Sequence, residues 1–227
     1  PEGELVARTS AHASAVSGIH WCGEEEIASA CYGRVSFWDP ASGDLRERLD
    51  WKGSLIALAV SPDGAVVACG SQDRNVHFWR RRSGEDSMMT MTGYLYKPAA
   101  IAFDPGARLL ATSGAEYATV WNFSGAGPEG SSPELLEGHS EPITDLCFAH
   151  ARRRLATGAA DGLVLIWDLD AEGRGRLVGG APATAPVERL TGRGDDKALA
   201  AIDTAGGVTV WHSAGAASAA RLGDETS

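Results

Sequence analysis

The sequence predicts an all-β protein, a β-propeller built of four-stranded antiparallel blades. Three observations predict it. A tryptophan stands at or near the end of a similar apolar stretch five times, and successive tryptophans are 41, 42, 46 and 44 residues apart. A repeat of about 40–45 residues is the length of four short strands, as in a propeller blade. No stretch has the periodicity of an amphipathic helix. The five residues are Trp38, Trp79, Trp121, Trp167 and Trp211.

Five repeat units follow from this alignment, and together they predict a single propeller domain over residues 1–212. The predicted units cover residues 12–50, 51–92, 93–137, 138–182 and 183–212. Residues 213–227 are rich in alanine and are predicted to be a frayed C-terminal tail.

The first three units repeat one plan of strands and turns. The first unit is AVSGIHWCGEEEIASACYGRVSFW. The second has Pro62-Asp63-Gly64 as its first turn, and the third has Asp104-Pro105-Gly106 at the same place. In the third unit, residues 124–134 form a Gly-, Ser- and Pro-rich insertion, which predicts a flexible loop between the third and fourth strands.

The fourth unit shows the strands most clearly. Strands are predicted over 142–149, 155–160, 163–169 and, more weakly, 176–180. Asp161-Gly162 predicts a two-residue hairpin between the second and third strands. The third strand, LVLIWDL, is apolar on both faces, which is typical of a strand covered on both sides by neighbouring sheets. The fifth unit, VERLTGRGDDKALAAIDTAGGVTVW, repeats the plan.

Five units leave two ways to complete a ring, since propellers have about 4–8 blades. Leu5 to Thr9 are predicted to be an outer fourth strand that leads into His12. The favoured alternative is a seven-bladed ring of which about two N-terminal units are missing, and a first residue other than Met supports it. In the other alternative the five units close alone, and Leu5 to Thr9 complete the fifth blade beside Val208 to Trp211.

Residues 5–212 resemble the WD-repeat propeller family. In that family a blade holds a hydrogen-bonded tetrad: a His before the first strand, a Ser or Thr in the second, an Asp in the tight turn and a Trp in the third. The fourth unit matches in full with His139, Thr157, Asp161 and Trp167. The resemblance implies a structural role for these residues, because each satisfies a buried polar group of the next, rather than a catalytic His–Asp pair.

The other units depart from the tetrad. The first has His12 but lacks the Asp. In the second and third units Trp51 and Tyr94 stand where the His would be, and Cys69 replaces the hydroxyl residue of the second. The fifth unit keeps only Trp211.

Composition and charge limit the kinds of partner and the compartment that we expect for this chain. The formal net charge of −10 argues against nucleic acid as the partner, because phosphate binding needs a basic surface. No apolar run approaches the ~20 residues of a membrane helix. The four cysteines form no C-x-x-C pair, so we expect no metal and a reduced, cytoplasmic protein. Frequent Ala, Gly and Arg favour a bacterial origin.

Catalysis has no supporting motif, and neither catalytic residues nor a cofactor is expected. Asp145 is the one strong candidate for a carboxylate that points into the channel. The alternatives kept open are a propeller enzyme of the metal-dependent hydrolase or lactonase type and a regulatory domain of a longer enzyme.

The resemblance implies a protein-interaction scaffold. In the family, one face of the ring commonly binds partners; the loops between blades and the turns between second and third strands form it. The candidate partner-binding residues on that face are Trp51, Lys52, Tyr94, Tyr96 and Lys97, and Arg193 is expected there too. Their surroundings hold all three methionines, which suit a recognition surface. Alternatively, Trp51 and Tyr94 only fill the space left by the missing His.

Overall fold

The computed structural model describes residues 3–81, 88–125 and 127–212, and these form antiparallel sheets only. The predicted C-terminal tail lies outside the described residues. No helix within the described ranges is long and apolar enough to cross a membrane.

Five sheets follow one another along the chain, each with its strands in sequence order. The first contains β1 (Val16–Trp21), β2 (Ile27–Cys31), β3 (Arg34–Trp38) and β4 (Leu45–Asp50). The second contains β5 (Leu55–Val60), β6 (Val66–Ser71), β7 (Val76–Arg80) and β8 (Met88–Met91). The third contains β9 (Ile101–Phe103), β10 (Leu109–Thr112), β11 (Tyr117–Asn122) and β12 (Glu134–Glu137). The fourth contains β13 (Ile143–Phe148), β14 (Arg154–Ala159), β15 (Leu163–Leu169) and β16 (Gly175–Pro182), and the fifth β17 (Val187–Gly192), β18 (Ala198–Asp203) and β19 (Val208–His212).

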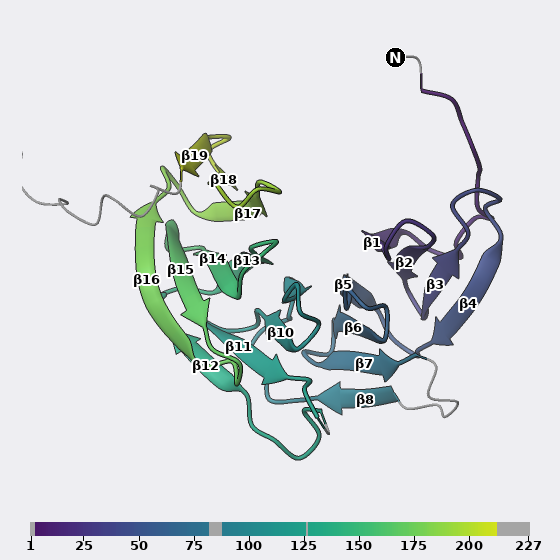
Figure 1. Cartoon of the computed structure of the whole chain (residues 1–227), viewed down its shortest axis with the longest axis horizontal. Coiled ribbons are helices and arrows are strands. Elements are labelled where there is room, and N and C mark those ends of the chain that lie inside the picture. The colour runs from purple at the N-terminus through teal and green to yellow at the C-terminus, as the bar shows by residue number, and fades with distance from the viewer. Residues whose placement is uncertain (1–2, 82–87, 126, 213–227) are drawn as a thin grey trace, which may run out of the picture.

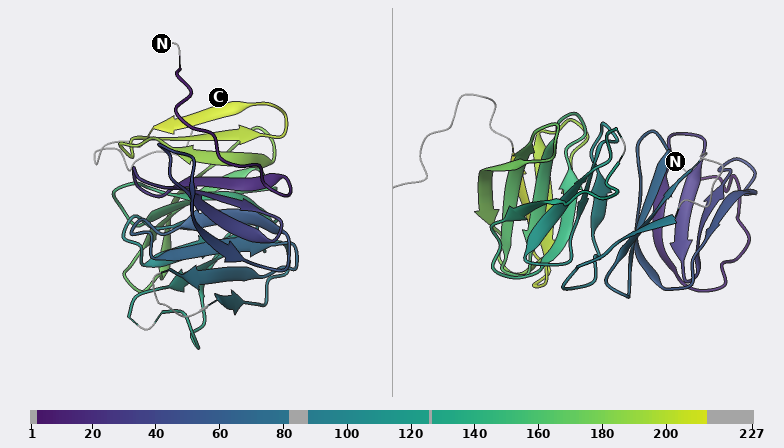
Figure 2. Two further views of the ribbon diagram at one scale, coloured as in Figure 1. Left: turned by 90° about the vertical axis from the view of Figure 1, so that its right-hand side faces the viewer. Right: turned by 90° about the horizontal axis from the view of Figure 1, so that it is seen from below.

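The sheets are the blades of an arc. Their first strands, β1, β5, β9, β13 and β17, lie nearest the centre, and the fourth strands lie at the outside (Figure 1). In side view the strands run between two faces that carry the loops (Figure 2). One face carries the linkers between blades and the turns between second and third strands, and it is called the linker face below. The all-β propeller architecture predicted from the sequence is confirmed.

The arc is open between the first and last sheets (Figure 1). The prediction that Leu5 to Thr9 form an outer strand is wrong, because residues 3–11 belong to no strand. The edge they were expected to complete, β19, lies across the opening (Figure 1), and the side chains of Leu5 and Val6 are 71% and 75% exposed. The five described sheets therefore do not close alone, and the seven-bladed ring stays a prediction.

Neighbouring blades are joined by apolar side chains that alternate along the strands. Between the third and fourth blades, Leu109 and Val120 share one buried cluster with Leu146, Leu155 and Trp167. Burial of such side chains stabilises each by about 1.5–3 kcal/mol. All six residues of β6 are buried, as expected for a strand covered on both faces. Each recurring tryptophan lies in the third strand of its blade, as the alignment predicted.

The insertion at 124–134 is attached to the second blade. Glu129 accepts hydrogen bonds from the guanidinium group of Arg80, at 2.8 Å from Nη2 and 3.2 Å from Nε. This bidentate pair lies at the end of β7, and it holds the described part of the insertion against the neighbouring blade. The sequence predicted a flexible loop here, whereas this ion pair ties the described part to the second blade. The sequence could not show it, because an ion pair between residues 49 positions apart leaves no local pattern.

Candidate functional site

The fourth blade contains a closed hydrogen-bonded network beneath the linker face. Nδ1 of His139 lies 3.1 Å from the carboxylate of Asp161, and Nε2 lies 2.9 Å from the Thr157 hydroxyl. The indole N–H of Trp167 donates to the same hydroxyl at 3.0 Å. The consistent assignment has Nδ1–H donating to Asp161 and the Thr157 hydroxyl donating to Nε2. Every polar atom of the network then has a partner.

Burial and charge set the ionisation of this pair. Burial lowers the pKa of His139 and outweighs the nearby carboxylate. Partial burial acts to raise the pKa of Asp161, but the amides of Leu163 and Ser140 and the imidazole of His139 outweigh it, so this pKa is lowered. At neutral pH the network therefore holds a neutral imidazole and a carboxylate. The imidazole side chain is 0% exposed and both its nitrogens are bonded, so it offers no free group to a substrate.

The first blade has three members of the same network. The indole N–H of Trp38 donates to the Ser29 hydroxyl at 2.7 Å, and Nε2 of His12 lies 2.8 Å from that hydroxyl. The sequence lacks an Asp at the turn, and no carboxylate is bonded to His12 among the described residues.

In the third blade, Tyr94 takes the place of the imidazole. Its hydroxyl accepts the indole N–H of Trp121 at 3.0 Å and lies 2.9 Å from the Thr112 hydroxyl. Thr112 is in turn bonded to Thr119. Burial raises the pKa of Tyr94. The Tyr94 hydroxyl is therefore engaged in the interior of the blade, which agrees with the alternative that Tyr94 fills the space left by the missing His; its contact with a partner stays a prediction.

In the second blade, Trp51 replaces the imidazole by packing instead of hydrogen bonding. Its ring stacks on His77, with ring centroids 3.8 Å apart. The indole nitrogen of Trp51 is buried and has no hydrogen-bond partner in the part of the chain that the structure describes. The Trp51 ring thus serves the interior of its blade, as the alternative interpretation expected, and its contact with a partner stays a prediction. His77 was missed from the sequence, although it stands two residues before Trp79 inside an apolar strand.

The linkers and tight turns of the first three blades are held together on the linker face. The hydrogen bonds that join them include Gly33 N–H to the Gly53 carbonyl at 3.0 Å, Gln72 N–H to the Ser54 carbonyl at 3.0 Å, the Arg74 guanidinium to the Leu95 carbonyl at 3.4 Å, and Tyr96 N–H to the Gly114 carbonyl at 2.8 Å. Segments from five separate parts of the sequence therefore form one continuous surface with a fixed backbone.

Exposed side chains project from this surface into solvent, and we call this set of residues the linker strip. Its apolar members are Tyr32, Leu95 and Tyr96, with exposed fractions of 60%, 52% and 51%. Its basic members are Lys52, Arg74 and Lys97, which are also exposed. Of the candidate partner-binding residues, Lys52, Tyr96 and Lys97 thus lie on the surface. Leu95 was missed, and its signal is a large apolar residue between two tyrosines in a linker.

Arg193 does not belong to this face. It lies in the turn between β17 and β18, at the opposite end of the strands, and its guanidinium contacts Asp195 at 2.7 Å. The expectation that it flanks the partner-binding residues is wrong, because the turn between first and second strands points away from the linkers.

Comparison with known proteins places these features in a family context. The family model described as "WD domain, G-beta repeat" matches residues 48–80 and 130–168, and the second segment includes the whole tetrad. Telomerase Cajal body protein 1 of Homo sapiens is 32% identical over 151 residues, which are 61% of this chain and 27% of that protein. Cell division cycle 20.1, cofactor of APC complex, of Arabidopsis thaliana is 25% identical over 155 residues, which are 66% of this chain and 33% of that protein.

A chain in the crystal structure of the mitotic checkpoint complex shares the fold, with a TM-score of 0.75 over 90% of this chain and 64% of that chain, at 19% identity. These findings support a WD-repeat β-propeller. The chain spans about a third or less of the curated relatives named above. Both are eukaryotic, so the bacterial origin is a prediction without support from them.

The carboxylate of Asp145, which was expected to point into the channel, forms a structural contact. Asp145 accepts the Leu190 N–H at 2.7 Å and so joins β13 to β17. Burial raises its pKa, against the effect of the Leu190 amide. No cluster of three metal-ligating side chains occurs within the described ranges. These described residues therefore give no support to the metal-dependent hydrolase alternative.

Proposed function

We propose that this WD-repeat propeller is a non-catalytic scaffold that binds a protein partner through the linker strip. The observation that carries the proposal is a set of exposed aromatic and apolar side chains, Tyr32, Leu95 and Tyr96, on loops whose backbones are hydrogen bonded to one another. Tyrosine and arginine are enriched among residues that dominate binding energies. A fixed backbone also lowers the entropy lost when a partner binds.

The relatives support a role in assemblies. One similar protein is described as a cofactor of the APC complex, and the solved structure with the same fold is a mitotic checkpoint complex. The net charge of −10 supports a protein partner over nucleic acid. All four cysteines are free, which supports the cytoplasm as the compartment.

The proposal can be tested by site-specific crosslinking. A photo-reactive benzoylphenylalanine at position 96 should crosslink a partner protein in cells, whereas the same group at exposed Leu177 on β16 should not crosslink that partner. A Tyr32→Ala and Tyr96→Ala double variant should then lose capture of the crosslinked partner by at least about tenfold, while its thermal unfolding is unchanged.

Leu177→Ala with Val178→Ala is the matched control, because it removes two exposed apolar side chains from the outer strand β16. Equal crosslinking from positions 96 and 177, or full capture by the folded Tyr32 and Tyr96 variant, would show that the linker strip is not the interface.

A further inference from the structure

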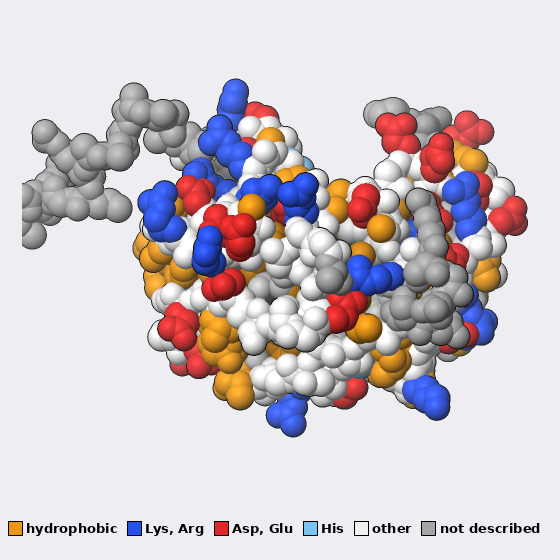
Figure 3. Space-filling model, turned by 60° about the horizontal axis from the view of Figure 1, so that its bottom comes forward, with side chains coloured by type: hydrophobic (Ala, Val, Ile, Leu, Met, Phe, Trp, Pro, Cys, Tyr) orange, Lys and Arg blue, Asp and Glu red, His pale blue; other side chains and the backbone are white. Residues whose placement is uncertain are grey.

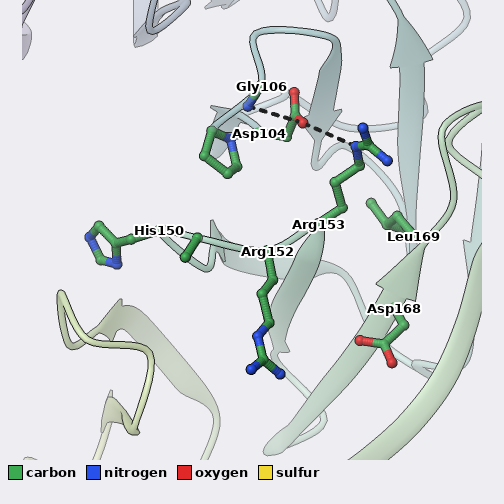
Figure 4. A pocket seen from close by; sticks show the side chains of 9 residues that line it. Asp104, Gly106, His150, Arg152, Arg153, Asp168 and Leu169 are labelled. Carbon is green, nitrogen blue, oxygen red and sulfur yellow. Dashed lines mark hydrogen bonds and ion pairs between the residues drawn. The ribbon is translucent and has the colours of Figure 1, made fainter.

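A cavity of about 530 Å³ lies on the face opposite the linker strip. Three segments line it: the turn at 104–106 in the third blade, the turn at 150–153 in the fourth, and residues 168–169 at the end of β15 (Figure 4). The two consecutive arginines of the second segment both line the cavity but point in different directions, Arg153 toward the turn at 104–106 and Arg152 away from it (Figure 4). This cavity is not used by the proposed scaffold function.

The two carboxylates of the cavity already have hydrogen-bond partners within their own blades. Asp104 is fully buried and accepts the amide N–H groups of Arg108 and Leu109, both at 2.7 Å, within its own turn. Asp168 accepts Nε of Arg154 at 2.7 Å, and this arginine holds the pKa of Asp168 below its usual value. Asp104 also forms an ion pair with Nε of Arg153 at 3.7 Å, and the charge of Arg152 contributes to the lowered pKa of Asp168.

Most guanidinium N–H groups of those two arginines donate no hydrogen bond to the described residues. Arg152 is exposed and forms no ion pair or hydrogen bond with any residue that the structure describes. The closest acidic oxygen to Arg153 is Oδ2 of Asp104, 3.7 Å from Nε, which is beyond hydrogen-bond length. The terminal nitrogens of Arg153 point away from that carboxylate (Figure 4). Two guanidinium groups with free N–H donors therefore face one cavity.

The turn that carries them is fixed in place. The N–H groups of His150 and Ala151 donate to the carboxylate of Asp196, in the fifth blade, at 2.7 and 2.9 Å. The Arg153 carbonyl accepts the N–H of Leu169 at 2.8 Å. The backbone of the arginines is thus held from the fourth and fifth blades before any ligand arrives.

The local charge also favours an anion. Residues 150–197 contain eight Lys and Arg residues and seven Asp and Glu residues, whereas the whole chain has a net charge of −10. Basic side chains gather on the side of the last two sheets, at the left of Figure 3. An anion that approaches this side therefore meets less negative charge than the net charge of the whole chain implies.

We propose that this cavity binds a phosphorylated serine or threonine side chain of a peptide segment. A phosphate monoester has three acceptor oxygens and about two negative charges, which match two guanidinium groups better than a single carboxylate does. The volume is larger than a phosphate group and leaves room for neighbouring peptide atoms against the apolar side chains of Pro105 and Leu169. Recognition of phosphorylated peptides by clustered arginines follows the same chemistry.

The test uses the full chain and fluorescent heptapeptide mixtures with phosphoserine, serine or glutamate at the centre and random residues elsewhere. Fluorescence anisotropy should show binding of the phosphoserine mixture at least about tenfold tighter than of the other two. Arg152→Gln with Arg153→Gln should weaken that binding by at least about tenfold.

Arg46→Gln with Arg48→Gln is the matched control, because it removes two exposed positive charges from β4. That variant and the Tyr32→Ala, Tyr96→Ala variant should retain binding, so loss of this site and loss of the linker strip are distinguishable. Equal binding of the serine or glutamate mixture, or full binding by the folded Arg152 and Arg153 variant, would overturn the proposal. Displacement by inorganic phosphate at the peptide's own concentration would overturn it too, since the site would then recognise the free anion.

Discussion

At the scale of single residues, the same polar requirement is met by different side chains in different blades. The indole N–H of the recurring tryptophan needs an acceptor, because an unpaired buried N–H costs about 1–3 kcal/mol. Thr157 supplies it in the fourth blade, Ser29 in the first and the hydroxyl of Tyr94 in the third. The residue types of the tetrad therefore differ among these three blades, but in each of them a hydroxyl group accepts the indole N–H.

Removing the Tyr94 hydroxyl should destabilise the protein. Tyr94→Phe leaves the Trp121 N–H without its acceptor, so we expect the free energy of unfolding to fall by about 1–2 kcal/mol. Tyr96→Phe removes the same atom from an exposed ring and should change it by less than about 0.5 kcal/mol. Urea unfolding of both variants compares the two, and equal effects would contradict the role given to Tyr94.

The tetrad of the fourth blade should behave as one unit. His139→Ala and Asp161→Ala should each lower the free energy of unfolding by about 2 kcal/mol, because each leaves buried polar groups unpaired. The double variant should cost less than the two single changes together, since they break the same network. Losses under about 0.5 kcal/mol for both single variants, the size expected for the exposed control Glu141→Ala, would argue against the tetrad.

At the scale of elements, blades are joined by buried charges as well as by apolar side chains. Arg81, at the end of β7, is only 6% exposed. Its guanidinium contacts Glu26 at 2.8 Å and Glu47 at 2.6 Å, and lies 3.7 Å from the centre of the Phe37 ring. All three partners belong to the first blade, so one side chain of the second blade holds the two together.

Breaking this contact should cost more than breaking an exposed ion pair. Arg81→Ala leaves the largely buried Glu26 without its partner, and we expect a loss of about 2–3 kcal/mol in the free energy of unfolding. Arg46→Ala, which breaks the exposed pair with Asp39, should have little effect. Thermal and urea unfolding provide the measurement, and similar losses in both variants would show that the buried contact does not join the blades.

At the scale of the whole molecule, several buried imidazoles make stability depend on pH. Burial lowers the pKa values of His20, His77 and His139 in the folded protein. Each imidazole therefore binds a proton more readily in the unfolded chain, where its pKa is about 6.5. The stabilisation is complete above that pH and is lost as the pH falls below it.

The urea midpoint should accordingly decrease between pH 7 and pH 5. Carboxyls with lowered pKa values, such as Asp161, lose their contribution only below about pH 3.9, so they do not contribute in this window. His77→Gln or His139→Gln should make the midpoint less dependent on pH, whereas His150→Gln, at an exposed ring, should not. A dependence that is identical in all three variants would rule out the buried imidazoles as its source.

The sequence by itself determined the all-β architecture, the five blades and the third strands that carry the tryptophans. These properties are local or periodic, so spacing and turn residues report them. It also identified the four members of the tetrad in the fourth blade, through a spacing that the family shares.

Only the tertiary structure decided which candidate residues are available to a partner. Trp51 and Tyr94 occupy the same linkers as Lys52 and Tyr96, yet their rings turn toward His77 and Trp121. The direction of a side chain in a linker depends on the space left by the blade beneath it, and no sequence period records that space. The open arc, the attachment of the insertion by Arg80 and the cavity between the turns at 104–106 and 150–153 likewise join segments far apart in the chain.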